Sequence, residues 1–265
     1  MKRFGKNVSL LIMGTAMAAG LLVGAAPTHA AASPQIKIVP GGYFQTGSTA
    51  QMLDLDHVVP YTVKWTVTAP AGICAESARI DDGYGATLAS LDDSTAPFPT
   101  QLSYLSYPWG SYSNGDAPPN IVVTVTDCGG NSTTASVNLA VRSEEEDRAT
   151  FSAGWVTGVC ECWSLRSARK STGAGQTATY TSTFNGIALL SDRNPGRGTA
   201  DIYLDGRFVR SLNAAAPTTT NRLIIWQTHF ATKARHTLQV RVTSGRFDVD
   251  AFLTTYDLPG WGNPA

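Results

Sequence analysis

Alternation of apolar and polar residues with a period of two is the feature that most limits what this chain can fold into. Such alternation turns successive side chains to opposite faces of an extended backbone, and it predicts β-strands. No segment of convincing length repeats instead with the helical period of 3.6 residues. Short strands with turn residues between them predict an all-β fold built from two β-sandwiches. The predicted strands include 61–67, 121–126, 135–141, 177–184, 200–204, 222–226 and 237–242.

The dipeptide Asp205-Gly206 predicts a tight β-hairpin between Tyr203-Leu204 and Phe208-Val209. A type I′ turn needs a positive φ at both central residues, and Asp-Gly is among the pairs that tolerate this conformation.

The charges divide the chain into two unlike halves. The sequence has 265 residues with 20 basic and 20 acidic side chains, and 43% of its residues are apolar, which excludes wholesale disorder. Residues 34–150 hold 5 basic and 13 acidic groups, a net charge of −8, whereas residues 151–265 hold 12 basic and 7 acidic groups, a net charge of +5. A nucleic-acid-binding protein is usually more basic overall, so no nucleic-acid partner is predicted.

The acidic run Glu144-Glu145-Glu146-Asp147 is predicted to be a solvated linker, because like charges repel one another. The sequence then predicts a first β-sandwich over 34–142, an acidic linker over 143–150, a second β-sandwich over 151–257 and a C-terminal tail over 258–265.

Residues 1–30 are predicted to be a secretion signal. Lys2, Arg3 and Lys6 precede an apolar run over 8–26, and small residues make Ala30 the expected cleavage point. The alternative is an uncleaved membrane anchor, although glycines and polar residues dilute the run. No second apolar segment approaches spanning length, so the mature protein is expected to be secreted, extracellular or cell-wall-associated, with no membrane partner after cleavage.

Sequence pieces in the second half form an ordered pattern over residues 151–256. They are Ser152-Ala153-Gly154-Trp155, Ser171–Gly175, Gly186–Leu190, Arg197–Gly206, His236-Thr237-Leu238 and Val249–Phe252. This pattern resembles the galactose-binding-like jelly-roll β-sandwich found at the C-terminus of many secreted actinobacterial proteins. The resemblance implies a fold and not a particular ligand.

The first half carries a second pattern, in Val63-Lys64-Trp65 and in Thr126–Asn131 before a last strand. Residues 34–142 are similar to bacterial immunoglobulin-like or fibronectin-type-III-like modules, and this resemblance implies a β-sandwich there.

The four cysteines fit an exported protein, in which disulfides persist. Four cysteines allow three pairings, and pairing inside each half favours Cys74–Cys128 and Cys160–Cys162. The second bridge needs a bent backbone, because alternate residues of a strand lie roughly 6.6 Å apart. Redox chemistry and metal binding are the alternatives, but a zinc site would need four ligands and no His lies near these thiols in the sequence.

No catalytic motif is present, and the sequence predicts that the protein is not an enzyme. It lacks a Gly-x-Ser-x-Gly elbow, a His-Glu-x-x-His zinc motif and a phosphate-binding glycine loop. The acid pairs Asp81-Asp82 and Asp92-Asp93 could serve glycoside hydrolysis, but adjacent carboxylates on surface loops usually face solvent. His236 is interpreted as a structural turn residue.

Asp248 and Asp250 lie two residues apart near the last predicted strand. They could bind a structural Ca²⁺ or pair with Arg241 or Arg246, and we favour the pairing. No metal and no cofactor are therefore predicted.

Binding is the function that remains, and five residues of the second half are the candidate ligand contacts. Trp226 ends an alternating strand beside Gln227, Trp163 adjoins a cysteine, and Arg197 and Arg207 belong to an excess of arginines that attracts anions. The predicted function is a secreted binding protein that recognises an extracellular glycan or cell-wall polymer through its C-terminal jelly roll.

Two alternatives remain open. The aromatic stretch Tyr104, Tyr107, Trp109 and Tyr112 could form an exposed patch in the first half or pack as a strand connection. The protein could also be a structural or accessory surface protein that contacts other proteins.

Overall fold

The structure, a computed structural model, describes residues 32–39, 43–53, 56–81, 86–106 and 118–257. Within these ranges the regular structure is β-strand, apart from two short 3-10 helices, η2 (Glu146–Arg148) and η3 (Ser164–Arg166). The predicted all-β, sandwich-type fold is therefore confirmed.

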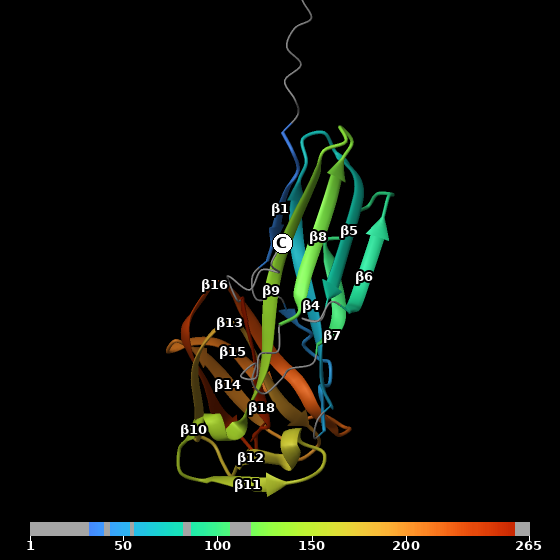
Figure 1. Cartoon of the computed structure of the whole chain (residues 1–265). Helices are drawn as coiled ribbons and strands as arrows, with labels where there is room; N and C mark the ends of the chain where they lie inside the picture. Colours follow the sequence, from blue (N-terminus) through green and yellow to red (C-terminus); the bar gives the residue numbers. More distant parts are fainter. Residues whose placement is uncertain (1–31, 40–42, 54–55, 82–85, 107–117, 258–265) are drawn as a thin grey trace, which may run out of the picture. The chain divides into compact units, whose positions relative to one another are not determined.

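The described strands belong to three sheets (Figure 1). In one sheet β4 (Asp56–Thr68) pairs with β1 (Gln35–Ile38), β2 (Tyr43–Phe44), β3 (Gln51–Leu53) and β7 (Gln101–Ser106). A larger sheet has the order β15 (Arg207–Asn213), β14 (Thr199–Leu204), β16 (Thr220–Ser244), β13 (Thr177–Arg193), β18 (Ala251–Asp257), β9 (Ser132–Glu145), β8 (Asn120–Asp127), β5 (Ile73–Asp81) and β6 (Thr87–Asp93), with β10 (Thr150–Phe151) beside β13. The third sheet holds β11 (Trp155–Val159), β12 (Ser167–Ser171) and β17 (Asp248–Val249).

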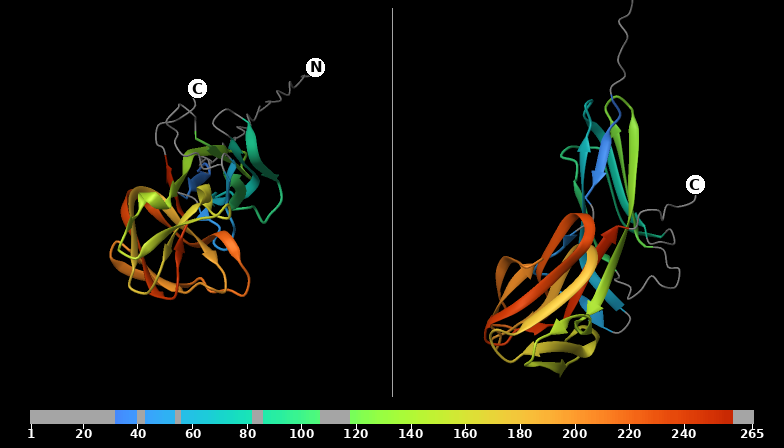
Figure 2. Two further views of the ribbon diagram at one scale, coloured as in Figure 1. Left: turned by 90° about the horizontal axis from the view of Figure 1, so that it is seen from below. Right: turned by 90° about the vertical axis from the view of Figure 1, so that its left-hand side faces the viewer.

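Strand β9 connects the two halves of the chain within the larger sheet (Figures 1 and 2). Its residues 132–138 pair with β8, and its residues 139–145 pair with β18. Glu144 and Glu145 lie opposite Phe252 and Ala251, and Glu146 opens η2 with only 5% of its surface exposed. The acidic run thus belongs to the end of β9 and to η2, whereas its charge predicted a solvated linker. Strand pairing with β18 holds its backbone, and the hydroxyl groups of Ser164 and Ser167 each bind one carboxyl oxygen, of Glu145 and Glu146 respectively.

Strand β13 is buried on both faces over residues 184–192. Leu189 belongs to a hydrophobic cluster of the C-terminal half, whereas Leu190 belongs to a second cluster that includes Trp65 from β4. A strand covered on both sides has a continuous apolar run in place of alternation, as Ile187–Leu190 has. One strand therefore serves two cores.

The hairpin at Asp205-Gly206 forms as predicted. Both residues have positive φ, 50° and 78°, and they join β14 to β15. His236 Nδ1 lies 2.7 Å from Asp205 Oδ2, and the His236 ring stacks on Phe230 with centroids 3.8 Å apart. His236 lies within β16 opposite Ser182 of β13, so its interpretation as a turn residue is wrong, although its contacts with the hairpin are structural.

Both predicted disulfides are present. Cys74 and Cys128 have Cα atoms 4.9 Å apart, and Cys160 and Cys162 have Cα atoms 5.0 Å apart. The second spacing is shorter than a straight strand allows, because Cys160 and Cys162 lie in the turn that follows β11.

The predicted secretion signal and C-terminal tail lie outside the described residues. Among the residues that are described, no helix has the length and apolar character needed to cross a bilayer.

Replacing Phe252 by Ala tests the C-terminal core. Phe252 is 1% exposed and stacks on Tyr180 with centroids 4.4 Å apart, so its loss should lower the free energy of unfolding by about 3–5 kcal/mol in urea denaturation. Phe208→Ala is the matched control, because Phe208 is 57% exposed, and a similar loss in both variants would contradict the assignment.

Candidate functional site

The five residues predicted to contact a ligand do not form one surface. Trp226 is 4% exposed and belongs to the C-terminal hydrophobic cluster, which leaves it no face for a sugar ring. Gln227 follows it on β16 with a buried Oε1 atom, and Arg207 is exposed at the start of β15. Strand alternation alone could not reveal that a second layer covers Trp226.

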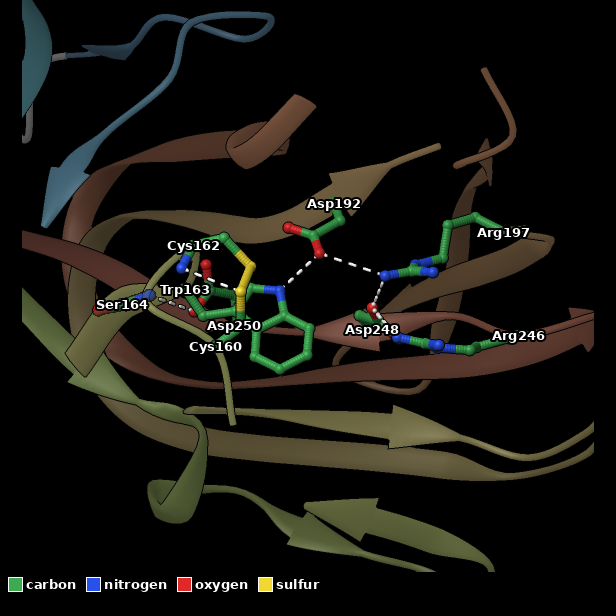
Figure 3. Close-up of a disulfide and its surroundings, with 9 residues drawn as sticks. All are labelled: Cys160, Cys162, Trp163, Ser164, Asp192, Arg197, Arg246, Asp248 and Asp250. Atoms are coloured by element: carbon green, nitrogen blue, oxygen red, sulfur yellow. Dashed lines mark hydrogen bonds and ion pairs between the residues drawn. A yellow bond between two sulfur atoms is a disulfide. The ribbon is translucent and has the colours of Figure 1, made fainter. Parts of the chain in front are cut away.

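Trp163 and Arg197 do meet, at the buried carboxylate of Asp192 (Figure 3). The Trp163 indole donates from Nε1 to Asp192 Oδ2 at 2.5 Å, and Arg197 Nη2 lies 3.3 Å from the same oxygen. Burial raises the pKa of Asp192, with the charge of Asp248 adding to the rise, while the Trp163 hydrogen bond and Arg197 oppose it. Asp192 was not among the predicted site residues, although an acid two residues after the apolar run Ile187–Leu190 was a usable signal.

Asp248 lies between two arginines, as Figure 3 shows. Arg246 donates to it from Nε at 2.9 Å and from Nη2 at 3.0 Å, which confirms the predicted pairing for this residue. Arg197 Nη2 forms a further ion pair with Asp248. Gly198, next to Arg197, allows its backbone segment to approach that of Ser244 closely, since a Cβ atom at Gly198 would lie 1.9 Å from the Ser244 carbonyl oxygen.

Asp250 was predicted to pair with an arginine, and this prediction is wrong. It lies between β17 and β18 with no exposed surface, and its Oδ1 accepts a hydrogen bond from the Ser164 amide at 2.8 Å. Burial raises the pKa of Asp250 well above its ordinary value, and the charges of Asp192, Glu145 and Glu146 add to the rise.

A structural Ca²⁺ held by Asp248 and Asp250 was the alternative to pairing with arginine. Asp248 is occupied by two guanidinium groups, and no group of three or more His, Cys, Asp or Glu side chains in the described ranges is arranged to hold a metal ion.

Two adjoining hollows lie on the sheet formed by β5, β6 and β8. Their volumes are about 350 and 330 Å³. They share Ser77, Asp92 and Thr124, so they form one elongated depression, which we call the polar hollow. The other lining residues are Ala75, Glu76, Ala78, Arg79, Thr87, Ser90, Asp93, Ser94, Val122 and Thr126.

The polar hollow contains carboxylates of different character. Glu76 lies opposite Asp93 in the register of β5 and β6, is 3% exposed, and accepts a hydrogen bond from the Trp65 indole. Burial raises the pKa of Glu76, the Trp65 bond opposes the rise, and the charge of Asp93 adds to it. Hydrogen bonds from the Thr95 amide and hydroxyl lower the pKa of Asp93. The sequence analysis considered Asp92-Asp93 but had no means of placing Glu76 opposite them.

Arg79 is the cation of the polar hollow, and it is paired. Its Nε lies 2.8 Å from Asp81 Oδ2, whereas no ion pair in the described part of the chain involves Asp92 or Asp93. The lining therefore has hydroxyl groups and an excess of negative charge, and it has no aromatic side chain.

Comparison with known proteins gives distant structural matches. No protein family and no curated protein matches the sequence. A two-domain esterase active on acetylated mannans, crystallised with mannopentaose, matches 44% of this chain and 36% of its own at 15% identity and a TM-score of 0.36. The catalytic unit of a thermostable GH87 α-1,3-glucanase from Streptomyces thermodiastaticus strain HF3-3 matches 49% of this chain and 29% of its own at 20% identity and a TM-score of 0.35. The catalytic domain of a GH87 α-1,3-glucanase in complex with nigerose matches 49% of this chain and 30% of its own at 18% identity and a TM-score of 0.34. The chain thus matches about a third of the length of these solved chains.

These comparisons correct one prediction. The lack of catalytic motifs led to the expectation that the protein is not an enzyme, whereas the solved chains that it matches are an esterase and glucanase catalytic domains.

Replacing Arg197 by Met tests the buried ion pairs. The Arg197 side chain is 7% exposed, and its removal would leave Asp192 and Asp248 short of a counter-charge. The free energy of unfolding should therefore fall by about 3–5 kcal/mol at pH 7. The loss should shrink at pH 4, because protonation of Asp192 removes a charge that the variant leaves uncompensated.

Arg79→Met is the control for this measurement, because the Arg79 side chain is 55% exposed in its pair with Asp81 and should contribute less than about 1 kcal/mol. Equal losses in the two variants would show that Arg197 has no special role in stability.

Proposed function

We propose that the protein binds a polysaccharide in the polar hollow. The observation that carries the proposal is the lining, in which hydroxyl groups from three strands, together with Asp92 and Asp93, line a depression made of two adjoining parts. Such a surface offers hydrogen bonds to a ligand with many hydroxyl groups, whereas an apolar ligand would leave those groups unpaired. The elongated form suits several sugar units better than one.

The charge of the polar hollow narrows the ligand class. Asp92 and Asp93 have no ion pair in the described residues, whereas Asp81 already neutralises Arg79 and Glu76 is buried against Trp65. An anionic polymer would be repelled there, and a polymer with free amino groups would be attracted. The favoured ligand is therefore a neutral or amino-sugar polysaccharide.

Affinity electrophoresis of the full mature chain tests this proposal with chitosan, a neutral glucan and polygalacturonate. Retardation by chitosan, weaker at 0.5 M salt, is the expected result. Asp92→Asn with Asp93→Asn should weaken chitosan binding about tenfold, since two exposed charge contacts contribute about 0.5–1 kcal/mol each.

Asp201→Asn is the matched control, because Asp201 is a partly exposed acid in the C-terminal half that only accepts a hydrogen bond from Ser211. Equal weakening by the control, or preferential binding of polygalacturonate, would sink the proposal.

A second candidate surface lies on β15, as the predicted jelly-roll site would require. Residues 207–211 are exposed, and Phe208 packs edge-on against Tyr203 with ring centroids 5.8 Å apart. An exposed aromatic ring between Arg207 and Arg210 would suit a sugar acid, with the ring against the sugar face and the guanidinium on its carboxylate. Loss of polygalacturonate binding in Phe208→Ala, with chitosan binding unchanged, would identify this surface instead.

We also propose the architecture and location that the sequence predicted. Residues 34–142 would be an immunoglobulin-like or fibronectin-type-III-like sandwich and residues 151–257 a galactose-binding-like jelly roll. Two disulfides support an exported protein, because such bonds persist in oxidising compartments. N-terminal sequencing of the mature protein tests cleavage after Ala30.

A further inference from the structure

The segment Cys160–Ser167, which we call the anchored loop, is held by four carboxyl groups from separate parts of the chain. They lie on β9, in η2, at the end of β13 and before β18. The contacts are Trp163 Nε1 to Asp192 Oδ2 at 2.5 Å, Ser164 N to Asp250 Oδ1 at 2.8 Å, Ser164 Oγ to Glu145 Oε1 at 2.8 Å and Ser167 Oγ to Glu146 Oε1 at 2.7 Å.

Each of these carboxyl groups uses one oxygen for the loop and leaves the other buried. Oxygens without a hydrogen-bond partner in the described part of the chain include Glu145 Oε2, Glu146 Oε2 and Asp250 Oδ2. A buried carboxylate without full hydrogen bonding is costly, whereas a protonated carboxyl group carries no charge to desolvate. For Glu145 and Asp250 the arrangement therefore favours the protonated form.

Counter-charges do not remove this cost. Arg197 and Arg246 bind Asp248 and Asp192, which accounts for two positive and two negative charges. No ion pair in the described residues joins a cation to Glu145, Glu146 or Asp250. Other charged side chains near the loop in the sequence or on neighbouring elements include Arg142, Glu144, Asp147, Arg148, Glu161, Arg166, Arg169, Lys170, Arg193 and Arg222.

The backbone of the anchored loop is strained. Leu165 and Arg166 have φ values of 39° and 66°, in the left-handed region that costs a residue with a Cβ atom about 1 kcal/mol or more. Such a conformation persists only where contacts enforce it, and here the four carboxyl groups supply those contacts. Leu165 is also 48% exposed, and Val159 before the loop is 83% exposed.

We propose that the anchored loop is a pH-responsive element, closed on its carboxyl anchors in acid and released as the pH rises towards 8. In acid the protonated Glu145 and Asp250 lie together without repulsion, and the closed loop keeps Leu165 in its strained, exposed position. Ionisation makes them repel one another, and opening of the loop admits water to the unpaired oxygens.

The direction follows from the titration of Glu145. Burial raises the pKa of Glu145 from 4.5 to about 7, with the charges of Glu146 and Asp147 adding to the rise and hydrogen bonds from Ser164 and Ser143 opposing it. A carboxyl group whose pKa is higher in the closed state stabilises that state below its ordinary pKa. The stabilisation is lost progressively as the pH rises from 4.5 to about 7.

Hydrogen–deuterium exchange of the full mature chain at pH 5 and pH 8, corrected for the intrinsic rate, tests the proposal. Protection of the amides in 160–167 should fall about tenfold or more between the two values, while that of β13 stays constant. Glu145→Gln keeps an oxygen for the Ser164 hydroxyl but cannot ionise, so its loop should keep most of its protection at pH 8.

Glu144→Gln is the matched control, because Glu144 adjoins Glu145 but pairs only at 3.6 Å with the exposed Arg148, and it should behave as the wild type. Asp250→Asn provides a second neutral anchor if Glu145→Gln does not fold. Equal protection of the wild-type loop at both pH values would overturn the proposal. So would recovery of protection at pH 8 on adding CaCl₂, since a divalent cation would then hold the anchors.

Discussion

The pairing of β9 with two different neighbours is the constraint on which the rest of the structure depends. Its first half completes the sheet that holds β8 and β5, and its second half pairs with β18. This pairing places Glu145 opposite Ala251, the residue that follows Asp250. In the next turn Glu146 accepts a hydrogen bond from the Ser167 hydroxyl. A flexible linker would leave these acids in water, and the anchored loop would have nothing to bind.

The buried carboxyl groups around the anchored loop are of two kinds, those paired with arginine and those with only neutral hydrogen-bond donors. Asp248 has two arginines, and Asp192 shares one of them, so the ion pairs offset much of the desolvation of these carboxylates. Glu145 and Asp250 receive only hydroxyl and amide donors, and burial raises their pKa values. The first arrangement makes a stable support at any moderate pH, whereas the second makes stability depend on proton concentration.

The polar hollow and the predicted ligand residues show how far a strand pattern can be taken. Alternation predicted a strand that includes Trp226, but the same pattern is expected whether the side chain meets solvent or a second layer of the fold. The structure buries Trp226 and exposes Phe208, which the sequence analysis named only as part of a hairpin. Glu76 was not singled out because its partner Asp93 belongs to the next strand, and register is decided by pairing.

The all-β class, the hairpin at Asp205-Gly206 and both disulfides could be predicted from the residues alone, because they depend on local periodicity, turn conformation and the small number of possible cysteine pairings. The strand end at the acidic run and the sharing of Asp192 by Trp163 and Arg197 became known only from the folded chain. Those outcomes depend on burial, which is set when distant segments pack together. A side chain's neighbours across a sheet are not encoded in its distance along the chain.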